Sequence, residues 1–334
     1  MGGLNCPTHK TRPVPFELRQ LELMNIAITG GTGFIGAHVL RLALERGHVI
    51  KALHRRHSIL KTPNSSQLEW ICGDLVSDDT WNRLLLGCDT LIHLGAAGVA
   101  NVNDAFDAVH TNLPGLAHMM KSAARYNVKR LVLAGSCFEY GDTGEKIGER
   151  GLREDDHLCP INVYGAAKAA ATLLAGPLSR DLGLECFVLR PFHTYGEGEI
   201  STRIIPSVIE AALAGRPIQT TDGRQLRDFV HVKDVAAGFI QAAEVSWGAV
   251  GNQTAMKILN LGTGSPTTLR DMIERLLLFC GRDVGCADFG ARQHRPNEMW
   301  RLVSDSSEAE RSIGWKPLIS LGVGLPNMVS MLRK

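Results

Sequence analysis

The sequence predicts an α/β protein with a doubly wound parallel sheet and a smaller C-terminal cap. Short apolar strands alternate with helical patterns from residue 24 to about residue 190, with short connections between them. The strands are almost wholly apolar, which is typical of a parallel sheet that helices cover on both faces. A glycine-rich segment at 29–36 (TGGTGFIG) follows the first strand and opens the first helix. Open α/β sheets bind their ligands at such strand–turn–helix units.

The expected elements follow this alternation. Strands are expected at 24–29, 48–53, 68–72, 90–94, 129–134 and 184–189. Helices are expected at about 35–46, 78–87, 104–126 and 162–182. Beyond residue 190, proline and glycine become frequent and the strands shorten, which favours a separate cap. The chain is expected to return to the sheet near 228–240 and 257–261.

This pattern divides the chain into three parts. The first 23 residues carry no apolar core pattern, so we expect a disordered extension, and Met24 is a candidate for the native start. The expected division is 1–23 for the extension, 24–190 with returning segments near 228–261 for the nucleotide-binding domain, and 191–227 with 262–334 for the substrate-binding cap.

Composition excludes several classes of protein. The 334 residues are 44% hydrophobic and 21% charged, which is ordinary for a globular protein. A formal net charge of +2 indicates neither nucleic acid nor a membrane surface as partner. No apolar run reaches the length of roughly 18–20 residues that a membrane span needs. The eight cysteines have no metal-ligand spacing, so we expect reduced thiols, no metal site and a cytoplasmic protein.

The three glycines of the turn each have a physical reason. Gly30 would make the tight turn, Gly33 would admit a pyrophosphate, and Gly36 would let helix and strand pack closely. The helix that follows presents free N–H groups and the positive end of its dipole. We therefore expect a dinucleotide at this turn, with Phe34 and Ile35 beside it.

The motifs resemble those of the extended short-chain dehydrogenase/reductase superfamily, in its NAD(P)-dependent sugar-nucleotide epimerase/dehydratase/reductase family. The matching segments are the GxxGxxG turn, YGAAK at 164–168, RPFHTYGEGE at 190–199, RQLRDFVHVKDVA at 224–236 and LNLGTGSPTTLRD at 259–271. The resemblance implies NAD or NADP on an N-terminal Rossmann domain and a nucleoside-diphosphate sugar under the cap. It also implies a homodimer that pairs the helices near 104–126 and 162–182.

Three residues are candidates for the chemistry. Tyr164 and Lys168 lie four apart in a helical pattern and so share a face. We expect the lysine ammonium to lower the phenol pKa, so that Tyr164 exchanges a proton with a sugar hydroxyl. Ser136 ends the fifth strand and stands four residues before Tyr140, as in the family, so its hydroxyl can complete a Ser–Tyr–Lys set.

Other residues are expected to bind rather than to react. The resemblance assigns Asp74 and Leu75 to the adenine side of the cofactor, and Tyr164 and Lys168 to cofactor binding as well. It also assigns Arg227 and Arg295 to the substrate diphosphate, and Arg suits bidentate phosphate contacts. Arg203 is a further candidate for the substrate. His193 departs from the family, since many members have Asn there, and it is a candidate for a contact with the substrate phosphate or sugar.

Departures from the family narrow the reaction. The 4,6-dehydratases carry an Asp-Glu pair after the active-site Thr, whereas this chain has Cys137-Phe138, which disfavours dehydration. The second strand ends without the acid that bonds the adenosine ribose of NAD, and carries Arg55 and Arg56 instead, which favours the 2′-phosphate of NADP. We therefore expect an NADPH-dependent ketoreductase of an NDP-4-keto-6-deoxyhexose. The alternatives are an NAD-dependent NDP-sugar 4-epimerase and a non-catalytic NADP-binding regulatory protein.

Overall fold

The computed structural model describes residues 22–56, 65–95, 105–250 and 255–333. All but the last two residues of the expected N-terminal extension fall outside these ranges. Among the described residues, no helix is long and apolar enough to cross a membrane.

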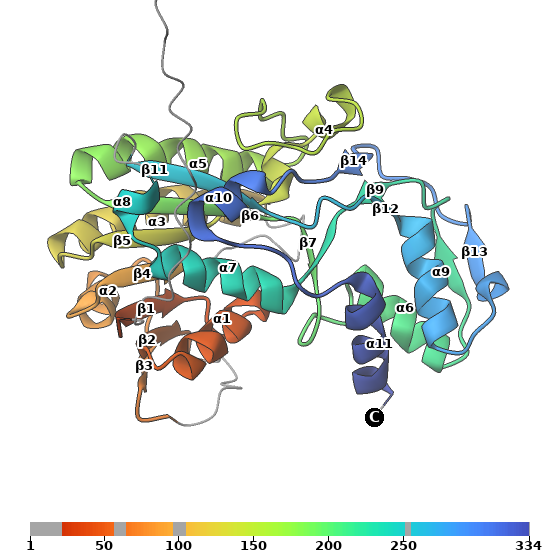
Figure 1. The fold of residues 1–334 in the computed structure, drawn as a ribbon, viewed down its shortest axis with the longest axis horizontal. Coiled ribbons are helices and arrows are strands. Elements are labelled where there is room, and N and C mark those ends of the chain that lie inside the picture. Colours follow the sequence, from red (N-terminus) through yellow and green to blue (C-terminus); the bar gives the residue numbers. More distant parts are fainter. Residues whose placement is uncertain (1–21, 57–64, 96–104, 251–254, 334) are drawn as a thin grey trace, which may run out of the picture.

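A seven-stranded parallel sheet forms the centre of the molecule (Figure 1). Its strands, in spatial order, are β11 (Met256–Leu261), β6 (Glu185–Pro191), β5 (Arg130–Ala134), β4 (Thr90–His93), β1 (Asn25–Thr29), β2 (Val49–His54) and β3 (Leu68–Cys72). The order reverses between β1 and β4, because the chain first winds outward to β3 and then returns to the other side of β1. Ligands of doubly wound folds bind at this switch point, outside the carboxyl ends of the strands. The predicted α/β fold class is confirmed.

Helices cover both faces of the sheet. One apolar core contains residues of α1 (Phe34–Glu45), α7 (Val232–Glu244) and α10 (Ser307–Ile313), and α8 (Trp247–Val250) packs against it. A second core, on the other face, contains residues of α2 (Asp78–Leu85), α3 (Ala105–Arg125) and α5 (Val163–Leu182). The sequence marks both ends of α5: the Asn162 side chain accepts a hydrogen bond of 2.7 Å from the Gly165 N–H, and Gly183 ends the helix with φ +68°.

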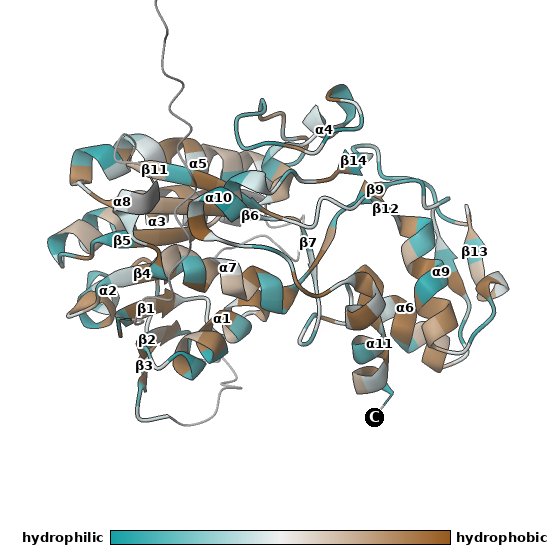
Figure 2. Cartoon of the chain, in the orientation of Figure 1, coloured by the Kyte–Doolittle hydropathy of each residue, from teal (hydrophilic) through white to brown (hydrophobic). Residues whose placement is uncertain are grey.

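A smaller lobe lies beside the sheet and has its own apolar core (Figures 1 and 2). It contains α6 (Ile204–Leu213), α9 (Leu269–Phe279), α11 (Leu321–Leu332), a short 3-10 turn η3 (Val284–Cys286) and the pair β8 (Ile218–Thr220) with β13 (Ala287–Phe289). Short ladders join this lobe to the sheet: β7 (His193–Tyr195) with β10 (Phe229–His231), and β9 (Leu226–Arg227) with β12 (Thr267–Thr268) and β14 (Arg301–Leu302). A 3-10 turn η2 (Cys137–Glu139) and α4 (Thr143–Lys146) follow β5.

Two segments differ from the expected path. The chain near 228–240 returns to the central sheet as a helix and not as a strand, because β10 pairs with β7 and α7, which begins immediately after it, packs in the core of the sheet. His231 ends the strand and caps α7, its Nδ1 accepting from the Lys233 N–H at 3.2 Å. In the C-terminal part, Ala309, Ile313 and Trp315 pack in the core of the sheet, although this region was assigned to the cap. The division into domains otherwise stays a prediction.

One buried carboxylate fixes the loops between the two lobes. Asp228 is fully buried and accepts hydrogen bonds of 2.6–3.1 Å from Thr263, Gly264 and Ser304. Since these donors lie on two segments other than its own, Asp228 holds the start of the smaller lobe against the carboxyl end of β11. These hydrogen bonds hold in place the segment that carries Arg227, one of the candidate substrate residues.

Candidate active site

The turn has no room for side chains at two of the three glycines of the GxxGxxG spacing, Gly30 and Gly36. Gly30 has φ +74°, and a Cβ on Gly36 would lie 2.0 Å from the Gly30 carbonyl oxygen. A Cβ on Gly33 would meet only that same oxygen, at 3.2 Å. Gly33 also caps α1 without a side-chain hydrogen bond, so the first N–H groups of this helix face an anion site without competition from a cap. Phe34 and Ile35 begin the helix and are half-buried.

The predicted adenine-side residues lie next to this turn, because β2 pairs with both β1 and β3. Arg55 and Arg56 are exposed at the carboxyl end of β2. Asp74 is exposed and Leu75 half-buried in the loop after β3, where the Asp74 carboxylate accepts from the Val76 N–H at 3.2 Å. The fold therefore gathers the candidate cofactor residues at one edge of the sheet, in a glycine cradle that fits a dinucleotide pyrophosphate.

Ser136 and Tyr164 meet at the end of β5. The Ser136 hydroxyl lies close enough to the Tyr164 phenol to lower its pKa, and Ser136 Oγ accepts from the Phe138 N–H at 3.2 Å. The Phe138 ring packs edge-on against the Tyr164 ring, with centroids 6.0 Å apart. Burial raises the pKa of the Tyr164 phenol to about 12, since removal from water disfavours the phenolate. Tyr164 is therefore protonated at neutral pH.

Lys168 lies on the same helix as Tyr164 and is 8% exposed. Its Nζ donates a hydrogen bond of 2.7 Å to the carbonyl oxygen of Ala134, on β5. Burial lowers the pKa of Lys168 to about 8. The expected lowering of the Tyr164 pKa by this lysine is not found in the chain alone: burial dominates, and the opposing effects come from the Ser136 hydrogen bond and the Arg203 charge.

His193 faces the same site from β7. Its ring lies between Phe138 and Phe229, with both centroid distances 5.9 Å. Its Nδ1 is buried and finds no hydrogen-bond partner among the described residues. Burial and the charges of Arg227 and Arg203 hold the pKa of His193 well below its ordinary value, so the imidazole is neutral. A buried polar atom without a partner at such a site is a ready contact for a ligand.

The three candidate arginines differ in their surroundings. Arg203 is exposed at the start of α6, and its charge acts on Tyr164 and His193. Arg227 is 9% exposed and donates to Glu298 at 2.7 Å, so it is already paired, which its motif did not predict. Arg295 lines a cleft of about 390 Å³ beside that pair, together with Asp142, Glu145, Lys146, Ile161, Pro296, Asn297, Glu298 and Trp300.

Two acids near the site were not predicted from the sequence. Glu199 follows β7, has a buried Oε2 without a partner among the described residues, and feels the Arg203 charge. Burial raises the pKa of Glu199 to about 7. Glu298 is the partner of Arg227. The only available signal was an acid in a glycine-flanked loop after a strand, which is too common a pattern to be specific.

The described residues contain no group of three or more His, Cys, Asp and Glu side chains that could hold a metal ion. All seven cysteines within the described ranges are free, as expected for a reduced chain.

A sequence profile of the NAD dependent epimerase/dehydratase family matches residues 26–261.

The chain belongs to this family. The match runs from β1 to the end of β11 and so includes the glycine turn, Ser136, Tyr164 and Lys168. Members of the family act on nucleotide sugars with a nicotinamide dinucleotide, which agrees with the resemblance noted in the sequence.

Individual relatives extend the similarity over almost the whole chain. A putative UDP-glucose 4-epimerase from Methanocaldococcus jannaschii is 28% identical over 324 residues, covering 92% of this chain and 98% of the relative. The structure of MoeE5 in complex with UDP-glucuronic acid and NAD is 29% identical, with a TM-score of 0.79 over 92% of this chain and 99% of that one. DesIV, a dTDP-glucose 4,6-dehydratase from Streptomyces venezuelae with NAD and TYD bound, is 25% identical, with a TM-score of 0.80 over 93% of this chain and 97% of that one.

Proposed function

We propose that this protein is an NADPH-dependent ketoreductase of a nucleoside-diphosphate 4-keto-6-deoxyhexose. The observation that carries the proposal is the carboxyl end of β2, where Arg55 and Arg56 are exposed and the strand ends without an acid. An acid there would repel the 2′-phosphate of NADP, and arginines attract it. A reductase consumes reduced cofactor at each turnover and typically uses NADPH.

The protonation of the site agrees with a reduction. When bound, the cofactor supplies a hydride to the sugar carbonyl carbon. The carbonyl oxygen then needs a proton, and the Tyr164 phenol, whose pKa burial raises to about 12, holds one at neutral pH. The Ser136 hydroxyl acts on the Tyr164 phenol and can donate to the same substrate oxygen. Lys168 is a buried cation beside the end of β5, where it can hold the nicotinamide ribose.

The residues after Ser136 count against dehydration. Elimination of water from the sugar needs an acid and a base, but Cys137 and Phe138 occupy the two positions where dehydratases carry them. Burial holds the pKa of the Cys137 thiol far above its ordinary value, to about 12, so it stays uncharged. Glu139 is fully buried and paired with Arg190 at 2.9 Å, so its carboxylate is already engaged.

Substrate binding is assigned to the side of the smaller lobe. Arg227 and Arg295 are placed to receive the diphosphate, which requires Arg227 to exchange Glu298 for a phosphate oxygen. The unpartnered Nδ1 of His193 offers a hydrogen bond to the sugar or to the adjoining phosphate. Arg203 contributes positive charge at the rim of the same site.

A homodimer is part of the proposal. Apolar side chains are exposed on α5 and α3: Val163 is 43% exposed, Leu173 67%, Leu174 36% and Val109 38%. Exposed apolar patches of this kind are typical of protein–protein interfaces. A second copy of the chain is the expected partner, through the same two helices.

An NAD-dependent 4-epimerase is the second candidate. It is favoured by the similarity to the putative UDP-glucose 4-epimerase of M. jannaschii and by the NAD in the MoeE5 and DesIV structures. An epimerase removes and returns its own hydride and shows no net cofactor consumption. A non-catalytic NADP-binding regulatory protein is the third candidate, and the intact set of Ser136, Tyr164 and Lys168 counts against it.

The test supplies purified protein with NADPH and an NDP-4-keto-6-deoxyhexose, and in parallel with NAD and UDP-glucose or UDP-galactose. We expect NADPH oxidation in step with ketosugar consumption in the first assay. Interconversion of the two UDP-hexoses without net cofactor change would instead establish the epimerase. Absence of turnover in both assays, with NADPH bound, would favour the regulatory protein.

A further inference from the structure

A buried ion pair stands directly behind Ser136. Glu139 is 0% exposed and Arg190 1% exposed, so both charges are removed from water. One carboxylate oxygen of Glu139 accepts from the Ser136 N–H at 2.8 Å, and the other accepts from Arg190 Nε at 2.9 Å. The same carboxylate thus holds the backbone of a candidate catalytic residue on one side and a fixed cation on the other.

The surrounding chain is shaped to admit this pair. A Cβ on Gly135 would lie 2.7 Å from Glu139 Oε1 and 3.1 Å from Arg190 Cγ, so the residue before Ser136 has to be glycine here. Glu139 and Ser136 also form a reciprocal capping box around η2, in which each side chain accepts from the backbone near the other. The Glu139 carboxylate therefore holds the Ser136 backbone through one hydrogen bond, while Ser136 Oγ accepts from the Phe138 N–H of the same turn.

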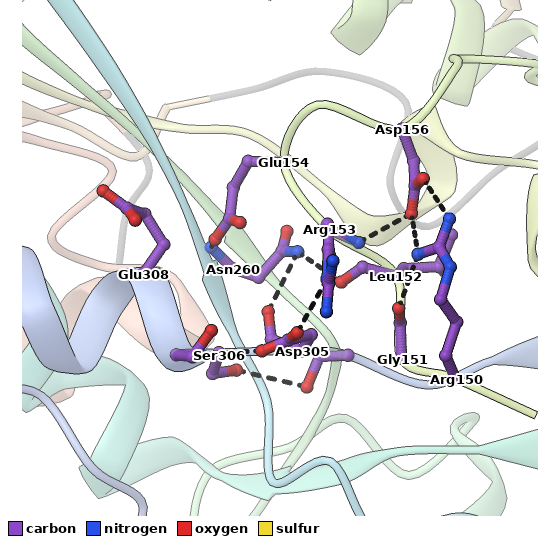
Figure 3. A network of polar contacts seen from close by, with 12 residues as sticks. Arg150, Gly151, Leu152, Arg153, Glu154, Asp156, Asn260, Asp305, Ser306 and Glu308 are labelled. Carbon is purple, nitrogen blue, oxygen red and sulfur yellow. Dashed lines mark hydrogen bonds and ion pairs between the residues drawn. The ribbon is translucent and has the colours of Figure 1, made fainter. Parts of the chain in front are cut away.

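Arg190 donates to three residues: Glu139, Tyr140 and, at 3.3 Å, the Glu154 carbonyl oxygen. It donates to the Tyr140 hydroxyl at 2.8 Å and lies over the Tyr140 ring, 4.7 Å from its centroid. The Tyr140 hydroxyl in turn donates to Asn260 Oδ1 at 2.8 Å. Asn260 donates onward to the Leu152 carbonyl at 2.8 Å, within the network that Figure 3 shows. Strands β6 and β11 and the segment around Leu152 thus hold the ion pair in one place.

The charge of Glu139 also acts on the two proton-carrying groups. Burial raises the pKa of Tyr164, and the Glu139 charge adds to this effect. Burial lowers the pKa of Lys168, and the Glu139 charge opposes this effect. In both groups, Glu139 favours the protonated form. The other groups that face Tyr164 are Ser136, Cys137 from η2 and Arg203 from α6. Lys168 faces His93 on β4, which is neutral because burial and the Lys168 charge lower its pKa to about 3. Glu139 is the carboxylate that acts on both.

We propose that Glu139, anchored by Arg190, is a positioning residue that fixes Ser136 and presents a buried negative charge to Tyr164 and Lys168. The inference rests on the proposed function, since it assigns the proton transfer to these residues. It gives the acid that follows Ser136 a role different from that of the carboxylate pair of a dehydratase: Glu139 acts through its neighbours and does not touch the sugar.

Two variants separate this role from simple support of the fold. Removing one member of a buried ion pair strongly destabilises a protein, whereas replacing both members is often tolerated. The paired variant E139Q/R190Q therefore removes both charges together while keeping polar side chains of similar size. E139D keeps the charge but is one methylene shorter, so its carboxylate cannot reach both the Ser136 N–H and Arg190.

Two measurements are made on each variant. The first is an ultraviolet titration of tyrosinate, in which the contribution of Tyr164 is isolated by subtracting the same variant carrying Tyr164→Phe. For E139Q/R190Q we expect the Tyr164 midpoint to move to lower pH by roughly half a unit or more, because the negative charge that disfavours phenolate is gone. For E139D we expect a midpoint near that of the wild type. This measurement needs no substrate.

The second measurement is steady-state turnover of the nucleotide sugar identified above. We expect kcat to fall about tenfold or more in both variants while KM stays within about twofold, because the substrate contacts are unchanged. An unmoved Tyr164 midpoint in E139Q/R190Q, or kcat within about twofold of the wild type in E139D, would overturn the proposal. If E139Q/R190Q does not fold, kcat and KM of E139D decide the matter. If no nucleotide sugar is turned over, the proposed function fails, and the titration still decides this inference.

Discussion

Lys168 Nζ donates a hydrogen bond of 2.7 Å to the carbonyl oxygen of Ala134, which fixes the second turn of α5 to the end of β5. Since Tyr164 lies one turn earlier on α5 and Ser136 lies two residues after Ala134, this bond sets the distance between phenol and hydroxyl. The proton-carrying group is thus placed by a helix that is bonded to a strand of the central sheet.

Replacing Tyr164 by Phe should abolish turnover while leaving cofactor affinity within about twofold. Only the phenolic proton is removed, and the edge-on contact with Phe138 is kept. General acid catalysis contributes on the order of 10²–10⁴-fold, so kcat should fall by at least a hundredfold. Steady-state kinetics and cofactor titration measure the two effects. Tyr126→Phe, which removes a hydroxyl that donates to Asn82 at 2.7 Å, is the control and should stay active. Wild-type turnover in Tyr164→Phe would reject the assignment.

The fold was predictable because its signals are local and repeated. Apolar strands followed by amphipathic helices specify a parallel sheet, and the order of the first six strands in the chain leaves few topologies open. Most predicted bounds agree with the structure within one or two residues. The pairing of the strand near 228–240 was not predictable in this way, since two apolar residues followed by His231 fit a strand of the central sheet or of a smaller sheet equally well.

The candidate site was predictable where a motif specifies a backbone shape or a helical spacing. Gly30 and Gly36 are glycines because the turn leaves no space for a Cβ, and the spacing of Tyr164 and Lys168 follows from the helix. Partners that depend on long-range contacts were not predictable. The pairing of Arg227 with Glu298 joins residues 71 apart in the chain, and only the folded arrangement brings them together.

Gly36→Ala should destabilise the fold and abolish cofactor binding. Its Cβ would lie 2.0 Å from the Gly30 carbonyl oxygen, so the turn would have to shift. Overpacking of this kind costs roughly 1–3 kcal/mol or more. Gly248→Ala is the control, because it lies in a helix where the nearest atom to an added Cβ is 3.9 Å away. Urea unfolding and cofactor titration compare the two, and equal behaviour would show that the turn tolerates a side chain.

Glu199→Gln should change the pH dependence of stability. Burial raises the pKa of Glu199 to about 7 from 4.5, so between these values the folded chain keeps a proton that the unfolded chain has lost. The free energy of unfolding of the wild type therefore falls as pH rises through this window. The variant lacks this fall and should gain about 1–3 kcal/mol relative to the wild type above pH 7, with little gain at about pH 4. Denaturation at both pH values measures it. The exposed Glu45→Gln is the control, and a gain that is equal at both pH values would contradict the prediction.

Leu173→Glu should weaken the proposed dimer. Leu173 is 67% exposed on α5, and a charge there would be buried without a partner in a packed interface. Light scattering across a concentration series should show a dimer for the wild type and dissociation at least tenfold easier for the variant. Leu278→Glu is the matched control, since Leu278 is 65% exposed on α9. A wild type of monomer mass at micromolar concentration would remove the dimer from the proposal.

Cofactor choice tests the proposed function most directly. We expect the wild type to bind NADPH more tightly than NADH, because Arg55 and Arg56 are exposed at the end of β2 and the strand itself ends without an acid that would repel a 2′-phosphate. A charge-assisted hydrogen bond contributes roughly 1.5–3 kcal/mol, so Arg55→Ala or Arg56→Ala should weaken NADPH binding about tenfold or more. NADH lacks the phosphate and should respond little. Arg125→Ala, an exposed arginine in the last turn of α3, is the control for a general loss of positive charge. Equal affinities for NADH and NADPH in the wild type, unmoved by either substitution, would remove the main support for a reductase and favour the NAD-dependent epimerase.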